Sequence, residues 1–314
     1  MPLSRRNMLL ALNAAMLPLG HATPGVKQTT TPYVHRFRSR MVEIADTRLE
    51  VLEAGEGPTT FACTHPYFDA SGPFPAGGLT EALAAAGRVF YVCPRGTAGS
   101  AKEQRREKLT LAQLADDMQE VRQTLGIKKW VPAGSSTGGM TALLYGLRYP
   151  GSTGGLILSS TVPSYRFSES PSSLYNPANP AFKELAALEK KGNDAAYARA
   201  KMLASLHNKG VLDLVLQNTK IQHERESVDD EEVGTDKWDQ EAHLGMIAVP
   251  TLIIAGRFDV PVGSLDPSLQ ILKSINGSEY AIMNGSGHFP YDEEPERYKQ
   301  VIADFSRRRL DPVS

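Results

Sequence analysis

The feature that most constrains the fold of this chain is a serine flanked by glycines, between an apolar run and a helical pattern. Lys128 to Ala133 predicts a buried strand, and Gly134-Ser135-Ser136-Thr137-Gly138 follows it directly. Behind that motif, Met140 to Leu147 has apolar residues at helical spacing. A turn this sharp strains the backbone at Ser136 and leaves no room for side chains at the two glycines. The pattern therefore predicts strand, tight turn and helix, with the hydroxyl of Ser136 held clear of the strand.

This geometry suits a nucleophilic serine. The N–H of Thr137 lies at the positive end of the following helix, where it can donate to the oxygen of a tetrahedral intermediate. Ser136 is therefore the candidate nucleophile, and Thr137 is a candidate for the oxyanion hole. A single Gly-x-Ser-x-Gly motif also arises by chance, so its meaning depends on the rest of the chain.

The rest of the chain alternates between strand and helix patterns. Eight runs predict strands: 41–44, 48–54, 59–64, 89–93, 128–133, 155–160, 251–255 and 279–283. Helical patterns separate most of them, including an amphipathic one that Thr110 caps. This alternation predicts an α/β fold with a mostly parallel eight-stranded sheet flanked by helices on both faces.

The alternation stops between Pro163 and Gly245. Three helical candidates lie in this stretch, Ala181 to Lys191, Ala195 to Leu206 and Val211 to Asn218, with no strand-like run. We expect a helical cap at 163–245, inserted into a core made of 41–162 and 246–309.

Two further candidates follow the last two predicted strands. Asp259 comes just after strand seven, in Gly256-Arg257-Phe258-Asp259, and His288 follows strand eight in Gly285-Ser286-Gly287-His288. The carboxyl ends of parallel strands share one edge of the sheet, so both side chains are expected near Ser136. A neutral imidazole can take the proton of a serine, and a carboxylate can orient that imidazole. The order Ser136, Asp259, His288 therefore predicts a catalytic triad.

The loop after strand three is His65-Pro66-Tyr67-Phe68-Asp69. In this architecture that loop supplies the second oxyanion donor. Pro66 has no N–H, so Tyr67 is the expected donor and Phe68 the alternative. His65 is interpreted as a structural histidine that braces the loop.

In these motifs, the chain from about Met41 to Arg309 resembles the α/β-hydrolase fold superfamily. Within it the chain looks similar to the capped proline-iminopeptidase-like group, which includes esterases and lactonases. It departs from true iminopeptidases after His65, where Pro66-Tyr67-Phe68-Asp69 stands in place of Gly-Gly-Pro-Gly. That departure argues against peptidase activity.

The resemblance implies a serine hydrolase that cleaves a small ester or lactone through an acyl-enzyme. An aminopeptidase of the iminopeptidase type, acting on a short peptide, is the first alternative. A ligand-binding protein on a hydrolase scaffold is the second, because fold alone does not establish catalysis. The residues expected to line the substrate site are Tyr67, Phe68, Ser135, Tyr165 and Trp238.

The first residues have the pattern of an export signal. Arg5 and Arg6 precede the apolar run Met8 to Leu19, and small residues follow where a signal peptidase would cut. We expect a signal peptide at 1–22, of the twin-arginine type in preference to the general one, then an arm at 23–40. The apolar run is too short for a stable membrane anchor. The protein is therefore expected in the periplasm or outside the cell.

Charge and cysteine content exclude several other roles. A formal net charge of -1 gives no electrostatic reason to expect a nucleic acid partner. Cys63 and Cys93 are the only cysteines and stand in no metal-binding pattern, so neither a metal nor a cofactor is expected. Each lies at a strand end, and two buried free thiols are preferred over a disulfide between them.

Overall fold

The computed structural model describes residues 37–65, 77–192, 194–218 and 237–310. The predicted signal peptide, most of the predicted arm and the loop residues Tyr67 and Phe68 lie outside these ranges. Among the described helices, none is both long enough and apolar enough to cross a membrane.

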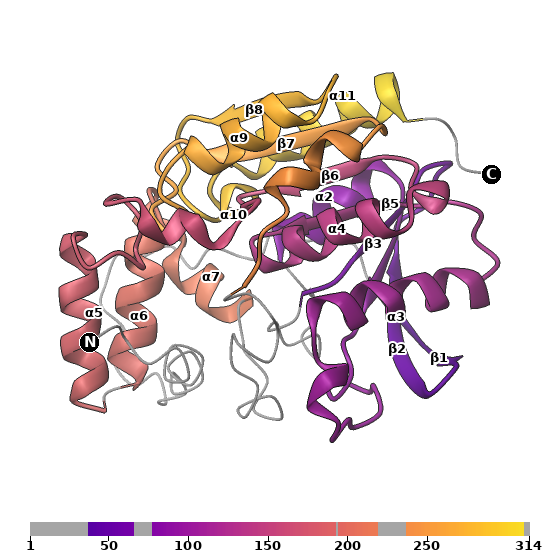
Figure 1. Ribbon diagram of the computed structural model, residues 1–314, viewed down its shortest axis with the longest axis horizontal. Coiled ribbons are helices and arrows are strands. Elements are labelled where there is room, and N and C mark those ends of the chain that lie inside the picture. The colour runs from indigo at the N-terminus through magenta and orange to yellow at the C-terminus, as the bar shows by residue number, and fades with distance from the viewer. Residues whose placement is uncertain (1–36, 66–76, 193, 219–236, 311–314) are drawn as a thin grey trace, which may run out of the picture.

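The centre of the molecule is one eight-stranded sheet with the order β1-β2-β4-β3-β5-β6-β7-β8 (Figure 1). Its strands are β1 (Arg38–Ile44), β2 (Thr47–Ala54), β3 (Thr60–Cys63), β4 (Arg88–Val92), β5 (Val131–Ser135), β6 (Leu156–Ser159), β7 (Thr251–Gly256) and β8 (Glu279–Met283). Strand β2 pairs antiparallel with β1 and β4, and every other pairing is parallel. The predicted fold class, a mostly parallel eight-stranded sheet, is confirmed.

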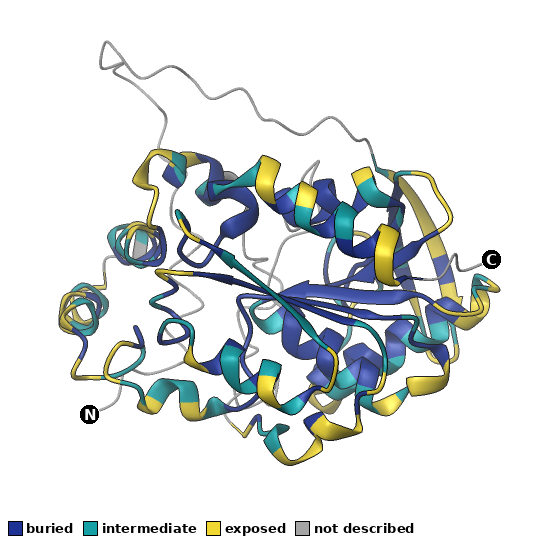
Figure 2. Cartoon of the chain, turned by 90° about the horizontal axis from the view of Figure 1, so that it is seen from above, coloured by how far each residue is buried: buried dark blue, intermediate teal, exposed yellow. Residues whose placement is uncertain are grey.

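Helices cover both faces of this sheet. The helices are α2 (Gly78–Ala86), α3 (Leu111–Thr124), α4 (Thr137–Arg148), α5 (Pro180–Lys190), α6 (Asp194–Ser205), α7 (Leu212–Asn218), α9 (Asp266–Ser274), α10 (Pro290–Glu293) and α11 (Pro295–Arg309). Apolar residues of α2 and α11 pack on one face, and those of α3, α4 and α9 pack on the other. Seen along the sheet, the strands form a buried layer between two partly exposed helical layers (Figure 2).

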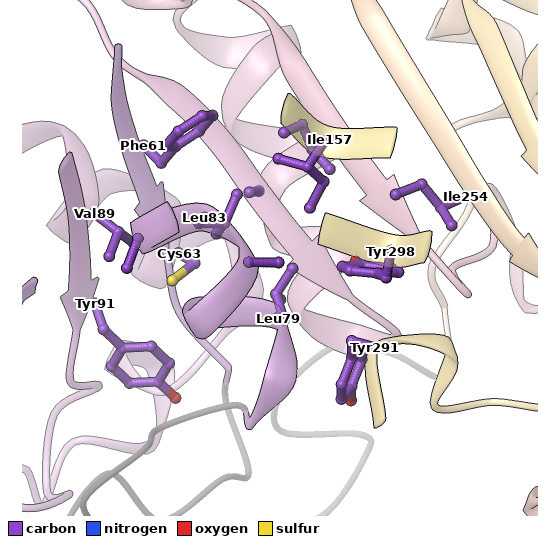
Figure 3. Close-up of a cluster of buried hydrophobic side chains, with 14 of the residues drawn as sticks. Phe61, Cys63, Leu79, Leu83, Val89, Tyr91, Ile157, Ile254, Tyr291 and Tyr298 are labelled. Carbon is purple, nitrogen blue, oxygen red and sulfur yellow. The ribbon is translucent and has the colours of Figure 1, made fainter. Parts of the chain in front are cut away.

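The core under α2 and α11 is built by alternation along the strands. Phe61 and Cys63 of β3 face these helices, while Ala62 between them faces α3. Figure 3 shows Leu79 and Leu83 of α2 over the strand side chains, with Tyr298 of α11 beside them. Burying such side chains stabilises the fold by roughly 1.5 to 3 kcal/mol each. The period of two in the sequence is therefore what places a helix on each face.

The first strand begins earlier than the sequence pattern predicts. Strand β1 starts at Arg38, within the predicted arm, whereas the alternating pattern starts at Met41. Residues Arg38 to Arg40 are exposed, so they show no apolar alternation. The guanidinium of Arg40 contacts the carboxylate of Glu53 across the hairpin. Backbone pairing and ion pairing, not burial, extend this strand.

A buried arginine fixes the loop after β4. Arg95 is 1% exposed and donates to Asp117 at 2.8 Å, Glu103 at 3.0 Å and Asp46 at 2.6 Å. Hydrogen bonding to Arg95 holds the pKa of Asp46 well below its usual range. Hydrogen bonds from Arg105 and Arg95 lower the pKa of Glu103 to about 2, while burial raises the pKa of Asp117.

The segment 163–245 lies between β6 and β7, and we call it the insertion. Its described residues carry α5, α6 and α7 and form no strand, as the sequence predicts. Helices α5 and α6 stand side by side at one end of the molecule (Figure 1). Leu185 of α5 packs with Tyr197 of α6 and with Val260, which follows the predicted catalytic aspartate. The insertion therefore packs against the loop after β7 as well as within itself.

Both cysteines are free and buried. Cys63 ends β3, and Cys93 follows β4, the neighbouring strand. This agrees with the preferred interpretation of two core thiols. Burial raises the pKa of the Cys63 thiol well above its usual value.

Candidate active site

Ser136 stands at a strained turn between β5 and α4. Its backbone has φ 53° and ψ -124°, a conformation that a non-glycine residue rarely adopts. A side chain at Gly134 would begin 2.1 Å from the carbonyl oxygen of Gly138, and one at Gly138 would begin 2.6 Å from that of Thr64. Only glycine fits at both positions, so the predicted tight turn is present.

Backbone and side-chain hydrogen bonds hold this turn in place. The N–H of Ser136 donates to the carbonyl of Ser159 at the end of β6, at 3.0 Å. The hydroxyl of Thr161 donates to the carbonyl of Ser136 at 2.7 Å. Thr161 also fills the space beside Gly139, where a Cβ would lie 2.6 Å from it. Thr161 supports the strained serine, and no sequence motif singled it out.

Asp259 and His288 come together after the last two strands. Nδ1 of His288 lies 2.7 Å from Oδ1 of Asp259. Asp259 is fully buried, whereas His288 is 8% exposed. Because the carboxylate occupies Nδ1, the imidazole presents its Nε2 to any reacting group. Ser136, Asp259 and His288 follow β5, β7 and β8, whose carboxyl ends lie at one edge of the sheet.

Two consecutive glutamates hold the loop Asn284 to Phe289, which we call the histidine loop. Glu294 accepts from the N–H of Gly285 at 2.8 Å and from the hydroxyl of Ser286 at 2.6 Å. Glu293 accepts from the N–H of Gly287 at 2.8 Å. Burial raises the pKa of Glu293, while the N–H groups that donate to it act in the opposite direction. Neither glutamate was singled out by sequence motifs.

The predicted oxyanion donors are only partly described. Thr137 is the first residue of α4, so its N–H belongs to the first turn, which has no carbonyl partner within the helix. Tyr67 and its alternative Phe68 lie outside the described residues. His65 is buried, and its ring lies against Gly138 of the serine turn. That contact fits the predicted structural role of His65.

The other predicted substrate residues lie in different surroundings. Ser135 is buried as the last residue of β5 and pairs with Ser159 of β6. Trp238 is buried, packs in the core with Val162 and donates its Nε1–H to the carbonyl of that residue at 3.0 Å. Tyr165 is partly buried, and its N–H donates to the carbonyl of Trp238 at 2.7 Å.

The described part of the chain contains no group of three or more His, Cys, Asp or Glu side chains able to hold a metal ion. What the geometry offers is a strained serine and a carboxylate-bound imidazole. This arrangement suits nucleophilic attack on a carbonyl group.

Comparison with known proteins finds similarity between this chain and hydrolases. The chain is 28% identical over 203 residues to the AB hydrolase superfamily protein YisY of Bacillus subtilis, a match covering 62% of this chain and 72% of that protein. It is 28% identical over 220 residues to a proline iminopeptidase of Saccharolobus solfataricus, covering 60% of this chain and 66% of the other.

Solved structures give the same fold. An α/β fold family hydrolase from Bacillus anthracis superimposes with a TM-score of 0.77 at 22% identity, covering 86% of this chain and 99% of its own. The enol-lactonase from Burkholderia xenovorans does so with a TM-score of 0.66 at 18% identity, covering 86% of this chain and 100% of its own. At these identities the likeness concerns the fold.

A family model described as the alpha/beta hydrolase fold matches residues 70–295, which is more than half of the chain. The match includes the serine turn and the residues up to and beyond His288. It agrees with the mostly parallel eight-stranded sheet and its flanking helices. This protein belongs to the α/β hydrolase fold family.

Proposed function

We propose that this protein is a serine hydrolase that cleaves a small ester or lactone through an acyl-enzyme. The observation that carries this proposal is the 2.7 Å contact between Nδ1 of His288 and Oδ1 of Asp259. A carboxylate at that distance fixes the tautomer in which Nε2 is free to accept a proton. A general base of this kind is what an otherwise weak serine nucleophile requires.

In the proposed reaction, the hydroxyl oxygen of Ser136 attacks the substrate carbonyl carbon while Nε2 of His288 takes the hydroxyl proton. The oxyanion accepts hydrogen bonds from the N–H groups of Thr137 and Tyr67. When the tetrahedral intermediate collapses, the carbon–oxygen bond to the leaving alkoxide breaks and the imidazolium returns the proton to it. When the substrate is a lactone, the hydroxyl group formed from this alkoxide remains covalently attached to the acyl group.

The acyl-enzyme is then hydrolysed by the same groups. Nε2 of His288 takes a proton from water, whose oxygen attacks the acyl carbon, and Ser136 leaves with that proton. Asp259 stays ionised and stabilises the imidazolium in both steps. The insertion is proposed to act as a cap that shapes the substrate site and excludes water from it.

The similarity to a proline iminopeptidase supports a second candidate, an aminopeptidase with the same triad. The likeness in fold to an enol-lactonase fits the first candidate equally well. The sequence Pro66-Tyr67-Phe68-Asp69 favours the ester or lactone substrate, because the glycine-rich sequence of true iminopeptidases is replaced there.

The test is a rate comparison on four substrates with the purified chain and Ser136→Ala. We expect turnover of p-nitrophenyl acetate, p-nitrophenyl butyrate or a γ-lactone, and at least about a 10³-fold loss in Ser136→Ala. Proline p-nitroanilide should remain uncleaved. Fast cleavage of that anilide would establish the aminopeptidase instead, and a Ser136→Ala variant with full activity would refute the role of the serine. A wild type that turns over nothing but binds ester or lactone would point to the ligand-binding alternative.

Export through the N-terminal signal is also proposed, on the basis of Arg5, Arg6 and the apolar run that follows. The test is cell fractionation of a bacterial host that expresses the full chain. Replacing both arginines by lysine should leave an uncleaved precursor in the cytoplasm if the twin-arginine route is used. Normal processing of that variant would indicate the general route, and an unprocessed wild type would refute export.

A further inference from the structure

One buried carboxylate joins the histidine loop to the insertion. Glu293 ends α10 and is 7% exposed. Its Oε1 accepts from the N–H groups of Gly287 at 2.8 Å and Phe289 at 3.4 Å. Its Oε2 accepts from those of His207 at 2.8 Å and Asn208 at 2.7 Å. Gly287 and Phe289 flank His288, whereas His207 and Asn208 belong to the insertion, so a single side chain holds two segments far apart in sequence.

A direct backbone contact reinforces this link. The N–H of His288 itself donates to the carbonyl of Ser205, the last residue of α6, at 2.8 Å. A Cβ at Gly287 would lie 2.3 Å from that same carbonyl oxygen, so only glycine allows the approach. The three consecutive N–H groups from Gly287 to Phe289 thus donate either to Glu293 or to the insertion. The backbone on both sides of His288 is therefore held by groups that lie outside the histidine loop.

On the insertion side, the contact is made by residues Ser205 to Asn208, which we call the α6 turn. Further contacts hold this turn in place. The ammonium group of Lys209 donates to the carbonyls of Leu203 and Leu206 and stabilises the end of α6. The ring of His207 stacks on that of Phe258, with centroids 3.9 Å apart and planes 12° apart. Phe258 directly precedes Asp259. The α6 turn therefore contacts both the histidine loop and the loop that carries Asp259.

We propose that Glu293 is a positioning residue, which ties the α6 turn of the insertion to the histidine loop and so sets the placement of His288. The inference rests on the proposed function, because it takes His288 as the general base. Its consequence is that the insertion does more than cover the substrate. The placement of the imidazole depends on the insertion as well as on Asp259.

A glutamine at this position separates the two halves of the contact. Glutamine has the size of glutamate but only one acceptor oxygen, and its amide nitrogen is a donor. In either orientation of the amide, its nitrogen faces the N–H pair of the histidine loop or that of the α6 turn, so two donors meet at one of these segments. Glu293→Gln can therefore hold the histidine loop or the α6 turn, but not both, while filling the same volume.

The first measurement is steady-state kinetics on p-nitrophenyl butyrate, with active sites titrated by a fluorophosphonate. We expect Glu293→Gln to lower kcat per titrated site by about 10- to 100-fold, since small displacements of a catalytic group have effects of this size. KM should stay within about threefold of wild type, because no substrate contact is removed. Glu296→Gln is the matched control, since that side chain is 85% exposed and pairs only with Lys299 among the ion pairs of the described residues, so its kcat should not change. A Glu293→Gln protein with a lower melting temperature but full kcat per site would show that Glu293 is merely structural and overturn the proposal.

The second measurement is amide hydrogen exchange, which does not depend on activity. In Glu293→Gln, exchange should become faster in peptides covering at least one of the segments 205–208 and 287–289, namely the one that loses its acceptor oxygen. Glu294→Gln should affect only the neighbourhood of Gly285 and Ser286, because these are the two residues that donate to the Glu294 carboxylate in the described part of the chain. Unchanged exchange in both segments of Glu293→Gln, together with an unchanged kcat per site, would overturn the link.

A variant on the insertion side keeps the proposal testable if Glu293→Gln does not fold. Asn208 has φ -81°, which proline can adopt, so Asn208→Pro removes one N–H donor to Glu293 without altering the histidine loop. It also removes the Oδ1 that accepts from the N–H of Gly210, and Asn208→Ala, which loses that acceptor alone, is its control. Asn208→Pro should lower kcat per site in the same direction as Glu293→Gln. If a folded Asn208→Pro keeps the kcat and exchange rates of wild type, the coupling is refuted. If the wild type neither cleaves esters nor reacts with the fluorophosphonate, the hydrolase proposal fails, and exchange alone decides whether Glu293 links the two segments.

Discussion

Oδ1 of Asp259 and Nδ1 of His288 lie 2.7 Å apart, although the two residues come from loops after different strands. Strands β7 and β8 are paired in parallel, so their carboxyl ends place these loops side by side. The carboxylate is fully buried at this contact. Its role is therefore tested most directly by changing its charge without changing its size.

Asp259→Asn should lower kcat about 10³- to 10⁴-fold while the protein stays folded. The amide nitrogen can donate to Nδ1 and so favours the tautomer with its proton on Nε2, which cannot act as a base. The measurement is kcat on p-nitrophenyl butyrate per titrated site. Asp266→Asn is the control, because Asp266 is exposed at the start of α9. Wild-type kcat in Asp259→Asn would remove Asp259 from the proposed triad.

Gly134→Ala should strongly destabilise the protein. The new Cβ would begin 2.1 Å from the carbonyl oxygen of Gly138, a backbone atom that cannot move without distorting the serine turn. We expect a loss of about 3 kcal/mol or more in the free energy of unfolding, measured with urea. Gly151→Ala meets no atom within 4 Å and should change stability little. Equal stability of the two variants would contradict the close packing at the turn.

Arg95→Met should make stability depend on pH between pH 7 and pH 5. Asp117, 1% exposed, would lose its charged partner, keep only the neutral donor Gln113 and remain as a buried charge, which costs about 3 to 5 kcal/mol at pH 7. Burial raises the pKa of Asp117 in the folded state, so the folded protein binds a proton more readily than the unfolded chain. Acidification to pH 5 should therefore recover part of the loss. Urea unfolding at both pH values measures this, and a loss that is independent of pH would count against it.

The free energy of unfolding of the wild type should instead decrease on acidification below about pH 4.5. The pKa of Glu103 is lowered to about 2 in the folded state, so the stability from its bonds to Arg105 and Arg95 is present above its ordinary pKa of 4.5. That contribution disappears as the pH falls from about 4.5 toward 2. Replacing Glu103 by glutamine should flatten the wild-type stability profile in this window.

The native protein should react slowly with Ellman's reagent. Both thiols are buried, and burial raises the pKa of Cys63, so little reactive thiolate forms. In denaturant without a reductant, two thiols per chain should be titrated. A count of zero would mean that Cys63 and Cys93 form a disulfide in the isolated protein.

The sequence predicted those parts of the molecule that follow from local patterns. Eight runs predicted the strands: the first two alternate between apolar and polar residues, and central ones such as β4 are continuously apolar, because a strand buried on both faces needs a continuous apolar segment. Ser136, Asp259 and His288 were predicted as a triad because each comes at or shortly after the end of such a run, and parallel strands bring their ends to one edge. The start of β1 at Arg38 was missed, since an exposed strand held by ion pairs has no apolar pattern.

Residues that act across long sequence separations could not be predicted. Thr161 supports Ser136, and Glu293 contacts His207, yet neither pair has a fixed spacing or a repeated pattern. A glutamate within an acidic run such as Asp292-Glu293-Glu294 is usually a solvated residue, so nothing in the sequence marks Glu293 as buried. Contacts of this kind depend on where the insertion folds back, which only the assembled structure specifies.

The position of β8 at the edge of the sheet has a consequence for synthesis. A chain that emerges from the ribosome amino end first contains Ser136 and the strands around it well before Asp259, and His288 only after β8. The imidazole reaches its place when β8 joins β7, and Glu293 follows it. Under the proposed mechanism, a nascent chain that lacks β8 has no general base for Ser136, so it should not hydrolyse esters until β8 has been made and paired with β7.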